Sequence, residues 1–277
     1  DTYSYMWPRD GAFVASALIK AGYAEVTRRF LSLCHQIVTP YGYFLHKYSP
    51  DGSVGSSWHP WFREGRHELP IQEDETALVL WTLWLFFERF HDLEFIKPLY
   101  RRLIIKSAEF LVQFRDEQTK LPLPSYDLWE ERYGVHTYTV STVIAGLRAA
   151  ANFAQAFGEI ELAVKYRTTA EEMRQAMQHH LFHRGLNRFA RNAVPNPAGG
   201  YHLDMTIDAS LMAIWYLGVF GTHDPLVEST MQAVRARLWV KTEVGGVARY
   251  EADYYQQIER HDIQRVPGNP WFICTLG

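Results

Sequence analysis

Residues 136–181 read HTYTVSTVIAGLRAAANFAQAF-GE-IELAVKYRTTAEEMRQAMQHHL, and this stretch decides the expected fold. In its first part apolar residues recur at spacings of three and four, as on one face of an α-helix: Val140, Val143, Ile144, Leu147 and Ala151. Gly158-Glu159 leaves only two residues for a turn before a second helical pattern begins. The stretch therefore predicts two antiparallel helices joined as an αα-hairpin.

The same hairpin pattern recurs along the chain. Periodicity predicts helices over 10–22, 24–38, 74–91, 93–116, 136–157, 159–181, 206–219 and 224–239, with a ninth that begins near 270. Odd-numbered helices begin about every 60–70 residues, which is the period of a helical repeat. Strand-like alternation is brief, with Gly42–Lys47 as part of a possible small hairpin. We therefore expect an all-α fold, an incomplete (α/α)6 toroid of paired helices, with the loops before the inner helices forming the site.

Composition narrows the possible partners. The chain has 277 residues, a formal net charge of −3 and no apolar run long enough for a membrane helix, so neither nucleic acid nor a membrane is an expected partner. Cys34 and Cys274 fall within helical patterns and are expected to be small buried hydrophobes. No linker interrupts the sequence, which predicts a single helical domain over residues 1–277.

The two ends of the sequence suggest a fragment. Asp1 stands inside what reads as an ordered motif, and Gly277 comes about one turn into the ninth helix. We expect the chain to be truncated at both ends, within a longer protein. Its compartment is not determined by the sequence, and a cytoplasmic location is the favoured expectation.

Clusters of acids, arginines and aromatic residues precede the odd-numbered helices. They are Tyr5-Met6-Trp7-Pro8-Arg9-Asp10, Gln72-Glu73-Asp74-Glu75, Tyr126-Asp127-Leu128-Trp129-Glu130-Glu131, Gly199-Gly200-Tyr201-His202-Leu203-Asp204 with Asp208, and Arg249-Tyr250-Glu251-Ala252-Asp253-Tyr254-Tyr255. A purely structural interpretation makes Asp10, Asp74 and Asp204 helix caps or first-turn acids. Carboxylates with arginine and aromatic rings also suit a sugar, which offers hydroxyl groups and apolar ring faces. The recurrence favours a polyhydroxylated substrate.

At these residues the chain resembles the glucoamylases and glucodextranases of glycoside hydrolase family 15, in particular the bacterial ones. The matching segments are Tyr-Ser-Tyr-Met-Trp-Pro-Arg-Asp (3–10), Pro-Ser-Tyr-Asp-Leu-Trp-Glu-Glu (124–131), Arg-Tyr (249–250) and Gly-Asn-Pro-Trp-Phe-Ile-Cys-Thr-Leu (268–276). They run along the whole chain, so the resemblance covers all of it.

The resemblance implies a role for each matching residue. Glu130 corresponds to the general acid of an inverting mechanism, and we expect Glu131 beside it to raise its pKa. The other implied roles are all in substrate binding: Arg9 and Asp10 on the 4- and 6-hydroxyls of the terminal glucose, Tyr5, Trp7 and Trp129 as aromatic walls, Glu131 near the cleavage point, and Arg249. The loop Trp58-His59-Pro60-Trp61 is a candidate for contacts on the leaving-group side. No cofactor or metal is expected.

The implied activity is exo-acting, inverting hydrolysis of α-glucosidic bonds, with release of glucose from the non-reducing ends of starch-like glucans. The α-1,4 linkage is the leading expectation, and a trehalase or an α-1,6-specific glucodextranase is the alternative. The general base of the family lies among helices beyond the nine predicted here, so the isolated fragment is expected to be inactive. A glucan-binding or regulatory domain without turnover is the alternative from another class.

Overall fold

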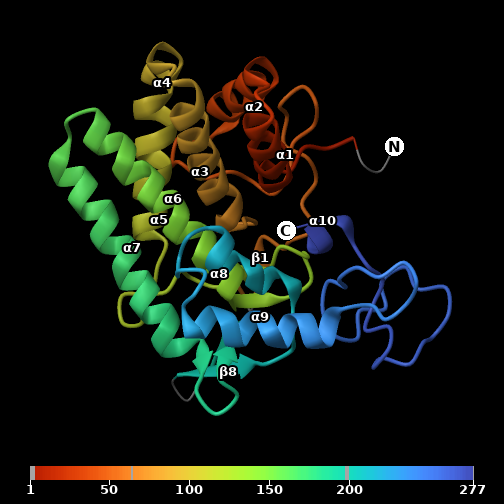
Figure 1. The fold of residues 1–277 in the computed structure, drawn as a ribbon. Helices are drawn as coiled ribbons and strands as arrows, with labels where there is room; N and C mark the ends of the chain where they lie inside the picture. Colours follow the sequence, from red (N-terminus) through yellow and green to blue (C-terminus); the bar gives the residue numbers. More distant parts are fainter. Residues whose placement is uncertain (1–3, 64, 197–199, 277) are drawn as a thin grey trace. The chain divides into compact units, whose positions relative to one another are not determined.

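The computed structural model describes residues 4–63, 65–196 and 200–276, and these form two compact units (Figure 1). The first unit comprises Asp1–Tyr133 and Thr142–Met173, and the second comprises Gly134–Ser141 and Arg174–Gly277. The single-domain organisation expected from the sequence stays a prediction.

The first unit is built from helices. They are α1 (Pro8–Lys20), α2 (Ala24–Ile37), α3 (Glu73–Phe90), α4 (Leu93–Leu99), the π-helix η1 (Tyr100–Ile105), α5 (Lys106–Gln113), and most of α6 (Thr137–Ala156) and α7 (Ile160–His180). α1 packs against both α2 and α3. α7 meets α6 through Arg167, whose Nη2 donates to Asn152 and Gln155. α3 packs against α5. The hairpins predicted over 10–38, 74–116 and 136–181 are therefore present (Figure 1).

The turns between paired helices form where the sequence predicts them. Gly22 and Gly158 adopt left-handed backbone conformations with φ of 88° and 78°, which glycine accepts without a steric cost. His91 ends α3 with φ of 52°, and the Asp92 carboxylate caps α4 by accepting from the backbone N–H of Phe95 at 3.0 Å. These short turns reverse the chain between the paired helices of the first unit.

The predicted helix over 93–116 is present as three consecutive helical segments that end at Gln113 and differ in their winding. Pro98 lies inside α4 and has no backbone N–H to donate to the preceding turn. Six residues of π-helix follow from Tyr100, before α-helical winding resumes at Lys106. Such π-helical winding is rare and occurs mostly as single turns within α-helices.

Helices approach each other very closely at one point in the first unit. Gly146 of α6 faces α3, and a Cβ atom at Gly146 would lie 2.7 Å from the Ala77 carbonyl oxygen. No other residue fits there without a shift of one helix. This contact fixes the spacing of α3 and α6, whose N-terminal neighbourhoods carry the acidic clusters.

Strands are few and short in the first unit. β1 (Phe62–Arg63) pairs with β2 (Arg66–His67) in an antiparallel ribbon, and β3 (Ser125–Tyr126) precedes the Glu130 loop. The small hairpin expected to include Gly42–Lys47 lies later in the chain: residues 42–46 form a loop, and the antiparallel pairing joins Lys47 and Tyr48 with Val54 and Gly55. Within the residues described, no helix combines the length and apolarity that a membrane span requires.

The second unit mixes strands and helices. β4 (Tyr133–His136), β7 (Asn192–Pro195) and β8 (Tyr201–Asp204) pair in antiparallel order, and β5 (Phe182–His183) pairs with β6 (Arg188–Phe189). The helical elements are the 3-10 helix η2 (Ala209–Met212), α8 (Ala213–Tyr216), α9 (Pro225–Leu238) and α10 (Phe272–Leu276). The predicted helix over 206–219 is therefore shorter, because Asp208 caps it late through the N–H of Ser210.

Candidate active site

A short backbone ladder positions the first aromatic residues of the candidate site. Met6 and Tyr48 exchange two backbone hydrogen bonds of 2.7 and 2.9 Å, and Tyr48 also bridges to Val54. In extended chains alternate side chains point to the same face, so Tyr5 and Trp7 share one face of this ladder. Their rings meet edge to face with centroids 6.1 Å apart.

Arg9 lies at the start of α1 and connects three segments of the first unit. Its side chain is only 7% exposed, and Nη1 donates to Gln72 Oε1 at 3.0 Å and to Asp74 Oδ2 at 3.2 Å. Nη2 reaches Glu130 Oε1 at 3.4 Å. A planar guanidinium suits such divergent contacts. Arg9 thereby brings α1, the N-terminal end of α3 and the loop that holds Glu130 together.

Glu130 occupies a tight loop whose backbone fixes its direction. Its φ is 62°, in the left-handed region that a glutamate rarely adopts. The Asp127 carboxylate accepts from the backbone N–H groups of Glu131 and Arg132 at 2.8 and 3.1 Å, and the Glu130 N–H donates to the Asp127 carbonyl at 2.9 Å. Backbone strain of this kind persists only where surrounding contacts enforce it.

The protonation of Glu130 is shifted by its surroundings. Burial raises the pKa of its carboxyl group, and the negative charge of Asp10 adds to the rise, while the cations Arg9 and Lys47 oppose it. A raised pKa keeps a larger share of the carboxyl protonated near neutral pH, as a general acid requires. Burial, and not the neighbouring Glu131, is the main cause.

Glu131, Trp129 and Asp10 have different environments. Glu131 Oε2 lies 2.7 Å from Arg132 Nη1, and its side chain is 32% exposed. Trp129 is half-buried in the same loop. Asp10 is the most exposed, at 65% of its side chain, and its Oδ2 lies 3.6 Å from Arg9 Nε. Their roles in substrate binding stay predictions.

The acids at the start of α3 are buried beside Arg9. Asp74 and Glu75 are fully buried, and Glu75 Oε1 lies 3.8 Å from Arg9 Nη1. Burial raises the pKa of both carboxyl groups. The interpretation of Asp74 as a first-turn acid of the helix is confirmed, and it also pairs with Arg9.

Two residues of the site were not singled out from the sequence. The side chain of Lys47 is buried, and that of His46 lies with Nε2 3.7 Å from Glu130 Oε2. Burial lowers the pKa of His46 to about 3, so this imidazole is neutral near pH 7. The only available signal was the presence of His46-Lys47 in an otherwise apolar and aromatic run, GYFLHKY.

The loop Trp58-His59-Pro60-Trp61 lies next to this group. Trp58 contacts Trp7 and His46, with ring centroids 6.0 and 5.4 Å apart, and His59 stacks on Tyr126 at 4.1 Å. A cavity of about 460 Å³ adjoins His59 and Pro60. It is also lined by Arg66, His67, Glu68, Leu69, Ile71, Phe114, Leu123, Pro124, Ser125, Tyr126 and Tyr133.

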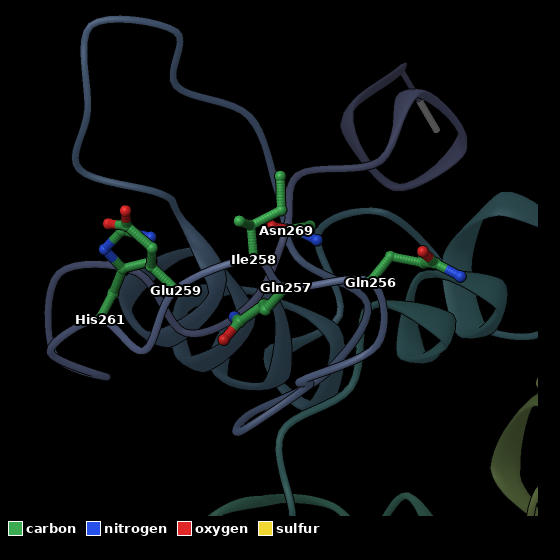
Figure 2. A pocket seen from close by; sticks show the side chains of 6 residues that line it. All are labelled: Gln256, Gln257, Ile258, Glu259, His261 and Asn269. Carbon is green, nitrogen blue, oxygen red and sulfur yellow. The ribbon is translucent and has the colours of Figure 1, made fainter.

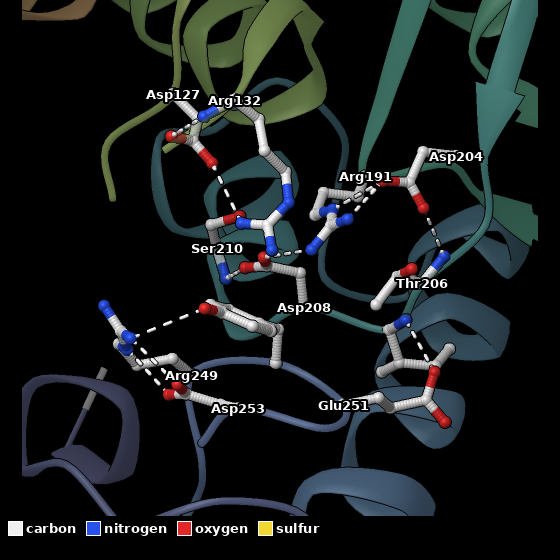
Figure 3. A network of polar contacts seen from close by, with 12 residues as sticks. Asp127, Arg132, Arg191, Asp204, Thr206, Asp208, Ser210, Arg249, Glu251 and Asp253 are labelled. Carbon is white, nitrogen blue, oxygen red and sulfur yellow. Dashed lines mark hydrogen bonds and ion pairs between the residues drawn. The ribbon is translucent and has the colours of Figure 1, made fainter. Parts of the chain in front are cut away.

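Arg249 belongs to the second unit, where it is paired with an acid (Figure 3). Its Nε and Nη2 atoms lie 2.7 and 2.9 Å from the two carboxylate oxygens of Asp253, and both residues are buried. In the same network Asp204 pairs with Arg191. Asp204 is the last residue of strand β8, so it is not a helix cap. The substrate-binding role of Arg249 stays a prediction.

The second unit also has an open hollow of about 490 Å³ (Figure 2). It is lined by Gln256, Gln257, Ile258, Glu259, His261 and Asn269. None of these residues was a predicted site residue. Within the described ranges, no group of three or more His, Cys, Asp or Glu side chains is arranged to hold a metal ion.

Three curated relatives align with nearly all of this chain. An uncharacterised glycosyl hydrolase of Methanocaldococcus jannaschii is 28% identical over 99% of the chain and 39% of its own length. A glucoamylase of Clostridium sp. is 24% identical over 99% of the chain and 38% of its own length. Trehalase 2 of Sulfolobus acidocaldarius is 24% identical, over 91% and 43% respectively. The chain thus spans about two fifths of the length of these relatives.

A solved structure confirms the fold class. A bacterial glucoamylase in complex with acarbose superposes with a TM-score of 0.74 at 21% identity, over 98% of this chain and 39% of that one. The expected all-α class, an incomplete (α/α)6 toroid, is thus confirmed. The family described as glycosyl hydrolases family 15 matches residues 2–277. Because this match spans nearly the whole sequence, the chain belongs to family 15 of the glycosyl hydrolases.

Proposed function

We propose that the full-length protein is an exo-acting, inverting α-glucosidase that releases glucose from the non-reducing ends of starch-like glucans, with a preference for α-1,4 links. Glu130 is the general acid. The observation that carries this proposal is the contact of Arg9 with Glu130 at 3.4 Å, in a partly buried site walled by Tyr5, Trp7 and Trp58.

In the proposed reaction the protonated Glu130 carboxyl donates its proton to the glycosidic oxygen as the bond to the anomeric carbon breaks. A second carboxylate takes a proton from the water that attacks the opposite face, about 6.5–9.5 Å from the acid in inverting enzymes. We assign no acid of residues 1–277 to that base. Arg9 and Asp10 hold the terminal sugar, which restricts cleavage to chain ends.

Attack on the opposite face of an α-linked sugar yields β-glucose as the first product. Proton NMR of the anomeric signals during early turnover distinguishes this outcome from retention, which gives α-glucose. Glucose release from maltotriose, isomaltotriose and trehalose assigns the linkage. The relatives support two of these substrates by name, since they include a glucoamylase and a trehalase.

The role of Glu130 is tested with Glu130→Gln in the full-length protein. We expect the rate of glucose release to fall about 10²–10⁴-fold, the usual contribution of a general acid, with glucan binding retained. Glu25→Gln is the matched control, because Glu25 is exposed on α2 and pairs with Arg29 in an i,i+4 contact. Activity of Glu130→Gln within a few-fold of the wild type would remove Glu130 from this role.

The competing proposal is a glucan-binding or regulatory protein without turnover. It predicts that the wild type binds glucans but releases no glucose from any of the three sugars. Binding measured by calorimetry, alongside the glucose assay, separates the two proposals.

A further inference from the structure

Lys47 is a buried lysine enclosed by aromatic rings in the first unit. The residue is 2% exposed, and its Nζ lies 3.8 Å from the ring centroid of Trp58, 4.7 Å from that of Tyr5 and 5.4 Å from that of Trp7. An ammonium group over ring faces is stabilised by the negative face of each ring. Lysines are almost never fully buried without such compensation. The position therefore requires a specific explanation.

The backbone around Lys47 is shaped to receive its side chain. The Lys47 carbonyl accepts from the Gly55 N–H at 2.9 Å, next to the Met6–Tyr48 ladder. A Cβ atom at Gly55 would lie 3.0 Å from Lys47 Cγ and 3.1 Å from Tyr5 Cδ1. Glycine thus leaves the room that the lysine stem and the tyrosine ring occupy. Two chain segments, one at Tyr5 and one at Gly55, thus pack around the side chain of Lys47.

The charge of Lys47 acts on the candidate general acid. The charged groups that face Glu130 are Arg9 and Asp10 from α1, Glu75 from α3, and Lys47 with the neutral imidazole of His46 from the 42–47 loop. The Lys47 ammonium lowers the pKa of Glu130, and Glu130 in turn favours the charged form of Lys47 against burial. Lys47 thus links the aromatic wall to the acid.

We propose that Lys47 is a positioning residue of this site, whose ammonium group fixes the rings of Tyr5, Trp7 and Trp58 as one wall and sets the charge that Glu130 experiences. This inference rests on the proposed function for its kinetic consequences. The proposed positioning of the three rings by Lys47 does not depend on whether the protein turns over substrate.

The experiment compares Lys47→Met with Lys47→Arg in the full-length protein. Methionine fills a similar volume without charge, whereas arginine keeps the cation. Lys165→Met is the matched control, because Lys165 is an exposed lysine of α7 whose Nζ lies 6.0 Å from the Tyr166 ring centroid. Thermal midpoints are measured for all three variants, so that a general loss of folding is recognised.

In Lys47→Met we expect the alkaline limb of the kcat/KM profile to move up by about half a pH unit or more, because a cation that lowers the pKa of Glu130 is lost. We expect KM to rise about tenfold, because the wall is no longer held in place. Lys47→Arg should keep the alkaline limb of the kcat/KM profile at its wild-type position and the KM close to the wild-type value. If the alkaline limb stays in place in a folded Lys47→Met variant, the proposed effect of the Lys47 charge on Glu130 is overturned.

A measurement independent of turnover tests the wall. The protein is labelled with 5-fluorotryptophan, and the 19F resonances of Trp7 and Trp58 are assigned with Trp7→Phe and Trp58→Phe. Lys47→Met should shift or broaden these two resonances, and Lys165→Met should leave them unchanged. Unchanged resonances in Lys47→Met overturn the positioning role. A wild type that releases no glucose refutes the proposed function instead, and the 19F result still decides the role of Lys47.

Discussion

The guanidinium of Arg9 contacts the carboxylate of Glu130 although 121 positions separate them in the sequence. The same guanidinium is hydrogen-bonded to Gln72 and Asp74 at the start of α3. One buried cation therefore connects the helix that begins the chain with the loop that presents the candidate acid. Substitutions of Arg9 or of the residues it contacts should therefore change the stability or the activity of the protein measurably.

Arg9→Met should lower the free energy of unfolding by about 3–5 kcal/mol, because it leaves Asp74 buried without its cation. Urea unfolding of the full-length protein measures the change. Arg29→Met is the control, since its pair with Glu25 is exposed and contributes about 0–1 kcal/mol. Equal losses in the two variants would contradict a special role for the buried pair.

Asp10→Asn should shift the alkaline limb of the kcat/KM profile to lower pH. Asp10 raises the pKa of Glu130, so removing its charge makes the acid lose its proton at lower pH. The shift is opposite in sign to that expected for Lys47→Met. A limb that moves up, or stays in place, would show that Asp10 does not act on Glu130 in this way.

The stability of the protein should depend on the protonation of Glu73. Burial raises the pKa of this carboxyl to about 8 from an ordinary value of 4.5, so the folded state holds a proton that the unfolded state has released. Stability from this group is therefore complete below about pH 4.5 and falls as the pH rises toward about 8. Glu73→Gln should remove this pH-dependent loss of stability, because a glutamine side chain does not titrate.

Urea unfolding at a series of pH values from 5 to 9 tests the expectation for Glu73. The stability of Glu73→Gln relative to the wild type should grow with pH up to about 8 and then level off. The difference between the two proteins isolates Glu73 from the other buried acids of α3. A difference that is constant with pH would refute the assignment.

Gly146→Ala should destabilise the contact of α6 with α3 by about 1–3 kcal/mol, the usual cost of overpacking. The new Cβ atom would lie 2.7 Å from a backbone oxygen that cannot rotate away. Alanine improves helix propensity by about 1 kcal/mol, which opposes but does not cancel this cost. In the control Gly221→Ala the Cβ meets nothing within 4 Å. Similar unfolding free energies for both variants would contradict the steric argument.

Local sequence patterns are sufficient to predict the helices and their pairing. Apolar residues at helical spacing in the 136–157 pattern predicted α6, and Gly22, His91 and Gly158 stand where the chain reverses. These are local properties, because periodicity and turn chemistry act within a few residues. The family motifs are also local, so they indicate Arg9, Asp10 and Glu130 as candidate site residues without any knowledge of the distances between them.

The residues that surround Glu130 depend on packing between segments that are far apart in the sequence. Lys47 and His46 lie in a loop with no helical or strand pattern, and their burial depends on Trp58 and Gly55 from a later segment. The rise in the pKa of Glu130 likewise comes chiefly from burial, and not from Glu131 next to it in the chain. Desolvation and through-space charge are set by packing between distant segments, which no local pattern specifies.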